Sequence, residues 1–371
     1  MGQMKITRIS LYKLAIPLKE PFITSLGVDT NALNVLVKIE TDAGITGFGE
    51  CSPYMPINGE SQDTCYAVGQ YFARVLIGKN PLEINDAIQL MDSIIYLNNS
   101  IKSAFDIALH DIAAQEAGLP LWKFLGGEAN KEIVTDYTVS IGEPSKMAAD
   151  AKWILAQGFP AIKVKLGQQG SKDIERIRAI RTAVGPAIPI RIDANQGWSV
   201  EEAITTLKAL SLFDIQHCEE PISRQLYTEL PRIKKESPIP IMADESCGDP
   251  YDAERLIAIN ACDYFNIKIG KAGGLQKAKK IVALADSAKI KMQVGAMIES
   301  RLAMSAFAHF ACCSPNIVHF DFDTALMFRE DPVEGGICYG KNGQIHLPSQ
   351  PGLGARISEQ WLAKMESIQF S

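Results

Sequence analysis

Eight short apolar runs recur along the middle of this 371-residue chain at a nearly constant interval, and most end in a polar residue. The residues that end successive runs are 24 to 28 positions apart, and stretches with helical periodicity lie between most of the runs. These residues are Thr138, Lys165, Asp193, Glu219, Asp244, Lys268, Gly295 and Asp321. Eight strand–helix units of this length are typical of a closed barrel rather than an open sheet. The period therefore predicts an α/β fold with a (β/α)8 barrel of the TIM type over residues 129–324.

The chain before the barrel has a different pattern. Residues 1–128 begin with alternating, β-branched segments that indicate strands, and residues 61–117 then have helical periodicity. The chain after the barrel, residues 325–371, continues no repeat. We therefore predict an α+β capping domain formed by residues 1–128, to which the C-terminal segment returns. The strands expected in this domain are 4–14, 33–42 and 45–51, with a hairpin turn at 42–44.

Composition excludes several classes of function. The chain has 37 Lys and Arg against 43 Asp and Glu, and a net charge of −6 argues against a nucleic-acid partner. No run approaches the roughly 18 apolar residues that a membrane span requires. The first residues lack the apolar core of a signal peptide, and the eight cysteines lack CxxC spacing. We expect reduced thiols and a cytoplasmic location, and an oligomer of identical chains is compatible with these features.

Three carboxylates end three consecutive strands of the expected barrel. Buried parallel strands are normally apolar, and barrel active sites are built from residues at the carboxyl ends of the strands. Asp193, Glu219 and Asp244 would therefore lie side by side, with no histidine or cysteine among them. Such oxygen ligands suit Mg²⁺, which predicts one Mg²⁺ per chain. The alternative, in which each acid caps the following helix, is less favoured for three successive strands.

Three lysines are expected to face the same interior. Lys163 and Lys165 are two residues apart on one strand, so their side chains share a face, and the alternating Ile162 and Val164 would pack against the helices. Lys268 ends the third strand after the one that ends at Asp193. It would therefore face Lys165 across the metal site. Solvated lysines on the outer face are the alternative. A lysine on each side of one substrate carbon suits inversion through a planar intermediate.

The chemistry that this arrangement suits is proton removal next to a carboxylate. Such a carbon acid is weak, because its conjugate base puts a second negative charge on the carboxylate, and a dication can neutralise that charge. A lysine with an ordinary pKa of about 10.4 is protonated at neutral pH and cannot act as a base. Burial beside Mg²⁺ and another ammonium would lower its pKa. Lys163 is the expected like-charged neighbour and would also contact the substrate carboxylate.

Five short motifs carry a resemblance to a known family. The chain resembles the muconate-lactonising subgroup of the enolase superfamily, which uses a lysine or histidine base with Mg²⁺. The resemblance implies that Lys165 and Lys268 are the acid/base pair. A lysine at position 268 disfavours the mandelate-racemase pattern, which has a histidine base. The motifs are KVK at 163–165, DAN at 193–195, EEP at 219–221, ADES at 243–246 and NIK at 266–268, and GLPLWKFLGG at 118–127 resembles a capping-domain marker.

Within that subgroup the chain is most similar to the dipeptide epimerases. Asp321 and Asp323, in FDFD, match a DxD motif that this resemblance assigns to binding the α-ammonium group of a dipeptide. Two carboxylates on one face at a strand end also suit a cation on chemical grounds, although local turn hydrogen bonds are the alternative. The same resemblance makes Thr138, in YTVS, a substrate contact, and the backbone of Ile298, in GAMIES, a further one.

One departure from the epimerase pattern narrows the substrate. The Ala-Glu epimerases that the chain resembles place an arginine in the first-domain loop over the site, and Gly27 stands there in this sequence. Lys38 is the only basic residue from 21 to 49. An acidic side chain would lose a charge-assisted partner worth about 1.5–3 kcal/mol. We therefore expect epimerisation, by 1,1-proton transfer, of Ala-Xaa dipeptides with a small, apolar or uncharged second residue, such as Ala-Ala or Ala-Val.

Other readings of the same residues stay open. An o-succinylbenzoate synthase, a muconate cycloisomerase or an N-succinylamino-acid racemase would use the same lysines and metal. Their substrates carry no free ammonium group, so Asp321 and Asp323 count against them. A catalytically silent barrel that serves as a binding module would lack a ligand or a base, and here none is missing. The histidines show no ligand spacing, and His217, which could face inward, is expected to be structural.

Overall fold

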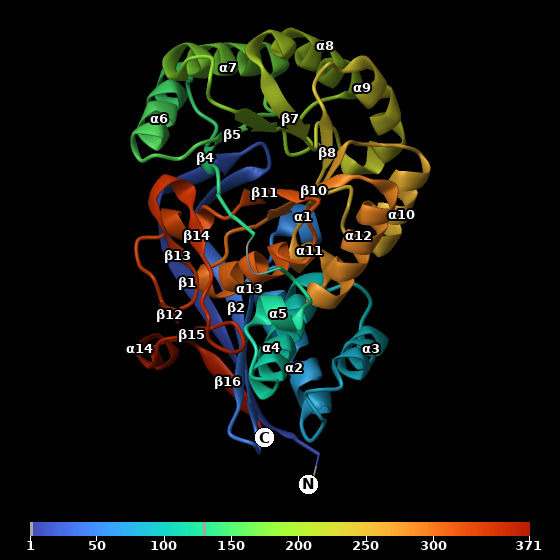
Figure 1. Ribbon diagram of the computed structural model, residues 1–371, viewed down its shortest axis with the longest axis vertical. Coiled ribbons are helices and arrows are strands. Elements are labelled where there is room, and N and C mark those ends of the chain that lie inside the picture. The colour runs from blue at the N-terminus through green and yellow to red at the C-terminus, as the bar shows by residue number, and fades with distance from the viewer. Residues whose placement is uncertain (1–2, 129–130) are drawn as a thin grey trace.

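The barrel predicted from the eightfold period is present. The computed structural model describes residues 3–128 and 131–371, and in it eight parallel strands form one sheet in the order β11-β10-β9-β8-β7-β6-β5-β4 (Figure 1). The two edge strands meet where the backbone N–H of Asp136 donates to the carbonyl of Phe320. The strands are β4 (Tyr137–Val139), β5 (Ile162–Lys165), β6 (Ile190–Asp193), β7 (Ile215–Glu219), β8 (Ile241–Ala243), β9 (Tyr264–Ile267), β10 (Lys291–Gly295) and β11 (Ile317–Asp321).

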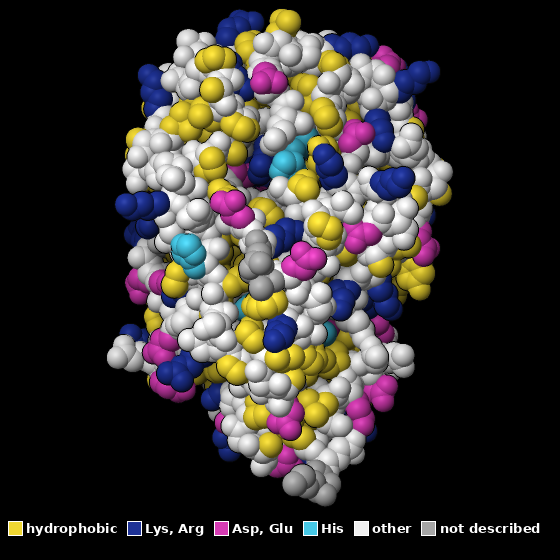
Figure 2. Space-filling view, viewed as in Figure 1, with side chains coloured by type: hydrophobic (Ala, Val, Ile, Leu, Met, Phe, Trp, Pro, Cys, Tyr) yellow, Lys and Arg dark blue, Asp and Glu magenta, His cyan; other side chains and the backbone are white. Residues whose placement is uncertain are grey.

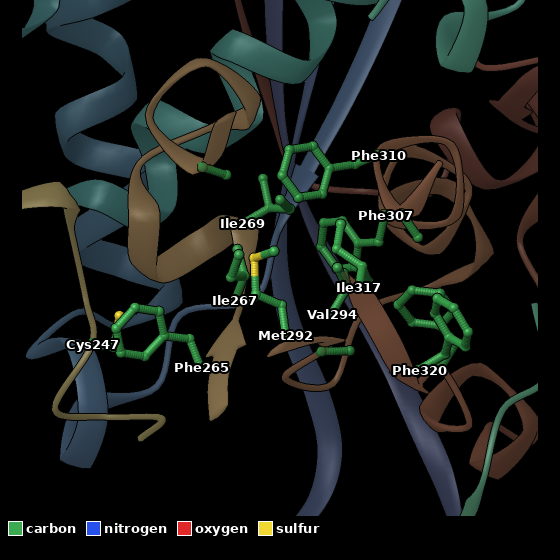
Figure 3. Close-up of a cluster of buried hydrophobic side chains, with 14 of the residues drawn as sticks. Cys247, Phe265, Ile267, Ile269, Met292, Val294, Phe307, Phe310, Ile317 and Phe320 are labelled. Atoms are coloured by element: carbon green, nitrogen blue, oxygen red, sulfur yellow. The ribbon is translucent and has the colours of Figure 1, made fainter. Parts of the chain in front are cut away.

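Helices cover the outside of this sheet. Side chains alternate along each strand, so residues such as Ile162 and Val164 are buried against the helices while Lys163 and Lys165 point into the barrel. Figure 3 shows this outer layer, where Phe307 and Phe310 lie close to apolar residues of the neighbouring strands. The helices are α6 (Pro144–Ala156), α7 (Gly170–Val184), α8 (Val200–Leu210), α9 (Leu230–Glu236), α10 (Pro250–Ala258), α11 (Ile269–Ala272), α12 (Leu275–Ala288) and α13 (Arg301–Ala311).

A second, antiparallel sheet lies beside the barrel, as the prediction of a capping domain requires. Its order is β16-β1-β2-β3, so the C-terminal strand returns to pair with the first strand. Gly47 and Gly49 in β3 let the helix α4 approach closely, because a Cβ at either position would clash with a helix carbonyl. The elements are β1 (Ile6–Thr24), β2 (Gly27–Thr41), β3 (Thr46–Cys51), β16 (Ser367–Phe370), α2 (Gln62–Leu76), α3 (Ile84–Ile94) and α4 (Asn99–Glu116).

The region expected to be a loop over the site, from Pro21 to Thr30, is a β-hairpin. Strands β1 and β2 continue far beyond the predicted limits of 4–14 and 33–42 and turn at Ser25 and Leu26. The sequence did not indicate this extension, because the hairpin leaves the apolar core and so has no alternating buried face. The hairpin carries the capping domain across to the barrel (Figure 1).

Short elements complete the chain. The division predicted at 128/129 borders on residues 129–130, which lie outside the described residues, so the domain limits stay a prediction. No helix in the described ranges is long and apolar enough to cross a membrane. All eight cysteines are free thiols. The remaining helices and strands are α1 (Met55–Asn58), α5 (Leu121–Phe124), β12 (Val333–Gly335), β13 (Cys338–Tyr339), β14 (Ile345–His346), β15 (Ala355–Ile357) and α14 (Glu359–Leu362).

The surface has no patch dominated by one charge on the face that Figure 2 shows. Lys, Arg, Asp and Glu side chains are interspersed there with apolar and neutral ones. This agrees with the small net charge of −6.

His309 joins three segments and makes stability depend on pH. Its buried ring accepts from the backbone N–H of Trp122 at 3.2 Å and donates to the carbonyl of Leu353 at 3.3 Å. Burial lowers the pKa of His309 to about 4. In the unfolded chain the histidine has a pKa of about 6.5, so as the pH falls it is protonated in the unfolded chain before it is protonated in the folded protein. The free energy of unfolding therefore declines from pH 6.5 toward pH 4.

We expect this histidine to contribute about 2 kcal/mol to the difference in unfolding free energy between pH 7 and pH 5. Urea unfolding would measure the free energy of unfolding at pH 7 and at pH 5. The difference between the two values should be about 2 kcal/mol smaller in His309→Gln than in the wild type. His346→Gln, which changes an exposed histidine, is the control. An unchanged pH dependence in His309→Gln would contradict the expectation.

Candidate active site

The register of the parallel strands brings the predicted site residues to one level. Lys165 on β5 pairs with Asp193 on β6, and Asp193 pairs with Glu219 on β7. Asp244 directly follows β8 and Lys268 directly follows β9. The carboxyl ends of these strands therefore form one continuous row of charged side chains, as the period implied.

The three acids predicted to bind a metal form a compact cluster. Asp193, Glu219 and Asp244 are fully buried, and one oxygen from each lies within 4.8 Å of the others. All of the donor atoms are carboxylate oxygens, which are the ligands that Mg²⁺ prefers. The helix-capping alternative does not describe these side chains, because they converge on each other and on lysines.

The electrostatics of the cluster favour a further cation. Burial, and then the charge of Asp193, raise the pKa of Glu219 to about 8, although Lys163 lowers it. Burial also opposes the ionisation of Asp193 and of Asp244, but the neighbouring lysines outweigh it and hold both of these pKa values below normal. Of the three acids, Glu219 is therefore the one whose negative charge is least compensated by the neighbouring lysines. A divalent cation bound by the three carboxylates would stabilise its ionised form.

Lys163 lies deepest among the lysines. Its ammonium is 2.8 Å from Glu219 Oε2, 2.8 Å from Asp321 Oδ2 and 3.3 Å from Asp193 Oδ2. Burial lowers the pKa of Lys163, but the surrounding carboxylates outweigh burial and raise it well above the usual value. Lys163 therefore stays a cation that links the acid cluster to Asp321.

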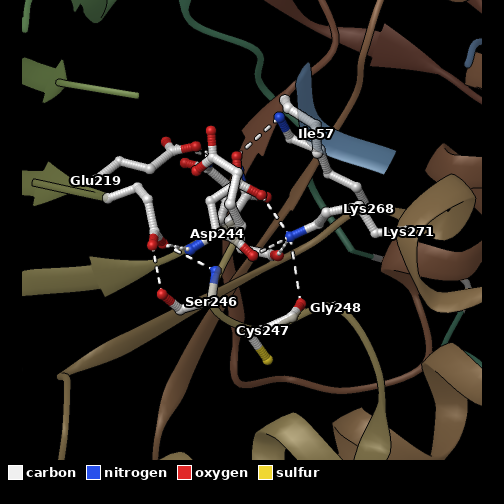
Figure 4. Close-up of polar contacts among 12 residues, drawn as sticks. Ile57, Glu219, Asp244, Ser246, Cys247, Gly248, Lys268 and Lys271 are labelled. Atoms are coloured by element: carbon white, nitrogen blue, oxygen red, sulfur yellow. Dashed lines mark hydrogen bonds and ion pairs between the residues drawn. The ribbon is translucent and has the colours of Figure 1, made fainter. Parts of the chain in front are cut away.

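Lys165 and Lys268 lie on the walls of one cavity of about 190 Å³. Lys165 Nζ is 2.6 Å from Asp193 Oδ2. Lys268 Nζ is 2.9 Å from Asp244 Oδ2, and both of these residues are labelled in Figure 4. Burial lowers the pKa of Lys268, but Asp244 and Glu219 outweigh burial and raise it. This shift is opposite in sign to the lowering predicted from the sequence. The predicted lowering depended on a dication bound to the carboxylates of the cluster. In this structure those carboxylates are paired with the lysines instead, and this pairing raises the pKa of Lys268.

The DxD residues and Thr138 line the same cavity. The backbone N–H of Thr138 donates to Asp323 Oδ2 at 2.6 Å, which joins the first and last strands of the barrel. Asp323 Oδ1 is buried and has no hydrogen-bond partner within residues 3–128 and 131–371. A carboxylate oxygen accepts hydrogen bonds and does not donate them. Asp323 Oδ1 is therefore suited to accept a hydrogen bond from an ammonium group. The local-turn alternative accounts for neither oxygen of Asp323 within the described residues, because Oδ2 accepts from a residue 185 positions earlier in the chain and Oδ1 has no partner.

The predicted contact through the backbone of Ile298 is only partly available. Ile298 lines the cavity, but its carbonyl accepts from Asn34 Nδ2 at 2.9 Å, and its N–H donates to Ser52 Oγ at 3.4 Å. Both partners come from the capping domain, so the sequence around Ile298 could not reveal them. The side chain of Ile298 is the part that faces the cavity without such a partner.

Two further residues support Asp244, and sequence analysis missed both. Lys271 contacts Asp244 Oδ1 and its backbone carbonyl (Figure 4), yet its surroundings in the sequence suggested only a glycine-rich turn. Glu220 accepts from the backbone N–H of Asp244 at 2.7 Å and from Ser246. Strict alternation from Glu219 would turn Glu220 outward, but its φ of 34° departs from the strand conformation. The available signal was the charge of Glu220 inside the EEP motif and of Lys271 three residues after the NIK motif.

Comparison with known proteins agrees with this geometry. A family model for the mandelate racemase/muconate lactonizing enzyme N-terminal domain matches residues 6–126, and one described as enolase C-terminal domain-like matches residues 146–361. The chain belongs to this family. The resemblance to the muconate-lactonising branch of the enolase superfamily is thereby confirmed at the level of the family.

Members of the family that are similar to this chain include epimerases, which are isomerases. The D-Ala-D/L-Ala epimerase of Cytophaga hutchinsonii is 56% identical over 98% of this chain and 99% of its own length. The L-Ala-D/L-Glu epimerase of Bacillus subtilis is 39% identical over 95% of this chain and 96% of its own length. A crystal structure of the dipeptide epimerase from Cytophaga hutchinsonii with Mg and D-Ala-L-Val has a TM-score of 0.98, is 56% identical, and covers 99% of this chain and 100% of that one.

Proposed function

We propose that this chain is a Mg²⁺-dependent dipeptide epimerase that inverts the α-carbon of the second residue of D-Ala-Xaa dipeptides, with Xaa small, apolar or uncharged. The observation that carries the proposal is the placement of Lys165 and Lys268 in one cavity, each paired with an acid of the metal-binding cluster. The similarity to a D-Ala-D/L-Ala epimerase and to a structure that holds Mg and D-Ala-L-Val supports it.

The acid cluster and Lys163 would bind the carboxylate end of the substrate. Asp193, Glu219 and Asp244 would hold Mg²⁺, which supplies positive charge where the second negative charge develops on the substrate carboxylate. Lys163 adds a fixed ammonium beside Glu219. Since Lys163 is held among three carboxylates and is not one of the two lysines on the cavity wall, its part would be to bind and orient rather than to transfer a proton.

Lys165 and Lys268 would act on opposite faces of the α-carbon. One neutral amine removes the proton from one face of the α-carbon, and the electron pair of that C–H bond moves into the carboxylate. The other lysine, as an ammonium, then returns a proton to the opposite face, which forms the new C–H bond and inverts the centre. For the reverse direction the two lysines exchange roles. Each lysine therefore deprotonates one of the two epimers.

The two DxD carboxylates would fix the first residue of the dipeptide. Asp323 offers a buried oxygen without a partner in the described part of the chain, and Asp321 lies beside it on the same cavity wall. An α-ammonium there would meet two carboxylates, and Thr138 would be its neighbour. A dipeptide held in this way would have its second residue between the lysines and the side chain of that residue toward the capping hairpin.

We expect a library of D-Ala-Xaa dipeptides in D₂O with Mg²⁺ to show incorporation of one deuterium at the second residue. Mass spectrometry would follow the exchange. The kcat/KM for D-Ala-L-Ala should exceed that for D-Ala-L-Glu by about tenfold or more, because Gly27 stands where the Ala-Glu epimerase pattern has an arginine. Comparable kcat/KM on the two dipeptides would show the inference from Gly27 to be wrong. No exchange on any dipeptide would refute the proposed function.

The N-succinylamino-acid racemase reading has its own support. The N-succinyl-L-Arg/Lys racemase of Bacillus cereus is 34% identical over 99% of this chain. Its substrates would bring a succinyl carboxylate toward Asp321 and Asp323, where two like charges oppose it. Faster exchange of an N-succinylamino acid than of D-Ala-L-Ala would favour this reading, and formation of an elimination product would favour a synthase.

A further inference from the structure

We propose that Asp29 is a specificity-determining residue that excludes acidic side chains at the second position of the dipeptide. The inference rests on the proposed function and deepens it. The absence of an arginine at position 27 removes an attraction, whereas Asp29 adds a repulsion. The two effects are separate, and the second can be removed by one substitution.

The hairpin places Asp29 above Lys165. Asp29 on β2 pairs with Phe22 on β1, and residues directly opposite each other on antiparallel strands project from the same face. The ring of Phe22 lies 5.8 Å from the ammonium of Lys165. Both Asp29 and Phe22 line the cavity that holds the two lysines. The carboxylate is therefore in the layer that the second side chain must enter when its α-carbon lies between the lysines.

The tip of the hairpin is fixed on the barrel. Ser25 Oγ donates toward the carbonyls of Ala194 and Asn195, at 3.0 and 2.9 Å, in the loop that follows the metal-binding Asp193. This anchor sets the height of the hairpin above the site. Asp29 is thus held over the reacting centre by direct contacts between the two domains.

Tyr54 occupies the space beside Gly27. A Cβ at Gly27 would lie 3.2 Å from the hydroxyl of Tyr54, so the place where a longer side chain would begin is taken by this phenol. Tyr54, Asp29 and Thr24 line the same cavity. Burial, and then the charge of Asp29, raise the pKa of Tyr54 to about 12, so the phenol stays a hydrogen-bond donor at neutral pH. In this chain an acid, Asp29, stands two residues from position 27, where the Ala-Glu epimerase pattern has a cation.

Asp29 is not neutralised by a cation of the protein. The lysines of the cavity are paired with Asp193 and Asp244, and Asp29 makes no ion pair within residues 3–128 and 131–371. Glu60, another acid of the cavity wall, accepts from the backbone N–H of Ser100. A second carboxylate about 5 Å from Asp29 would be disfavoured by about tenfold at the polarity of a partly exposed site. A neutral amide would not be disfavoured, since it can donate to Asp29.

The test compares two substrates of nearly equal shape, D-Ala-L-Glu and D-Ala-L-Gln. The wild type should prefer the glutamine dipeptide by about tenfold or more in kcat/KM, and Asp29→Asn should reduce this preference to about threefold or less. Asp29→Ser, a second way to remove the charge, should do the same. Asp63→Asn is the matched control, because Asp63 is a highly exposed acid of the capping domain that pairs with Lys13.

The outcomes separate this inference from the proposed function. If the wild type shows no preference between the two dipeptides, or if both Asp29 variants keep the wild-type ratio, Asp29 is not a specificity residue while the epimerase assignment stands. If the wild type exchanges no D-Ala-Xaa dipeptide, the proposed function fails. A reduced ratio in Asp63→Asn would also overturn the inference, because the effect would then come from overall charge.

Discussion

Lys165→Ala and Lys268→Ala are each expected to lower the rate of epimerisation by about 10³-fold or more, while each keeps proton exchange on one epimer only. A positioned acid or base contributes roughly 10²–10⁴-fold, and inversion needs both lysines. In either variant the remaining lysine can still remove the α-proton from the epimer that faces it and return a solvent deuteron to the same face. The two variants should therefore be selective for opposite epimers.

Proton NMR in D₂O can measure this directly. The signal of the second-residue α-proton should disappear from only one of D-Ala-L-Ala and D-Ala-D-Ala in Lys165→Ala, and from only the other in Lys268→Ala. Lys208→Ala, which changes an exposed lysine paired with Glu236, is the control and should resemble the wild type. Exchange of both epimers by either site variant would contradict the assignment of one lysine to each face.

Removing the divalent metal is expected to abolish turnover, and Mg²⁺ should restore it. Without a dication, the second negative charge on the substrate carboxylate would develop beside three buried acids. Dialysis against EDTA, assay, and readdition of Mg²⁺ would test this. Mg²⁺ at 100 times its Kd should also raise the free energy of unfolding by about 2.7 kcal/mol. Full activity in EDTA would contradict the proposed chemistry.

Glu219→Gln separates the metal from the stability of the fold. The variant should lose activity and most of the stabilisation by Mg²⁺, because one of three carboxylate ligands becomes an amide. Glu219 pairs with Lys163 and accepts from Asn266, so the variant should also lose some stability without Mg²⁺, and the increase that Mg²⁺ adds is the quantity to compare. Asp150→Asn, at an exposed ion pair with Lys146, is the control. An unchanged Mg²⁺ stabilisation in Glu219→Gln would exclude Glu219 as a ligand.

The sequence predicted the parts of the site that depend on periodicity. Parallel strands of equal spacing place their carboxyl ends at one level, so Asp193, Glu219 and Asp244 had to be neighbours once the barrel was accepted. Alternation along β5 was enough to turn Lys163 and Lys165 into the same interior. These are local or repeating properties, and a single sequence contains them.

The sequence did not predict the parts that depend on contacts between distant segments. The partners of Ile298 are Asn34 and Ser52, which lie more than 200 residues earlier in the chain. The hairpin from Pro21 to Thr30 has no buried alternating face, so nothing in its pattern indicated a strand. The support of Asp244 by Lys271 depends on how the short helix α11 packs, and α11 contacts α4 of the capping domain.

The repeat of apolar runs and their polar ends thus determined the barrel, the side on which its site lies, and the row of acids and lysines. Only the tertiary structure decided what closes that site from above, because the capping hairpin is positioned by its contacts with the barrel rather than by its own periodicity. The row of acids and lysines follows from the regular geometry of parallel strands. The wall that meets the second side chain, with Asp29 and Tyr54, follows from the docking of two domains.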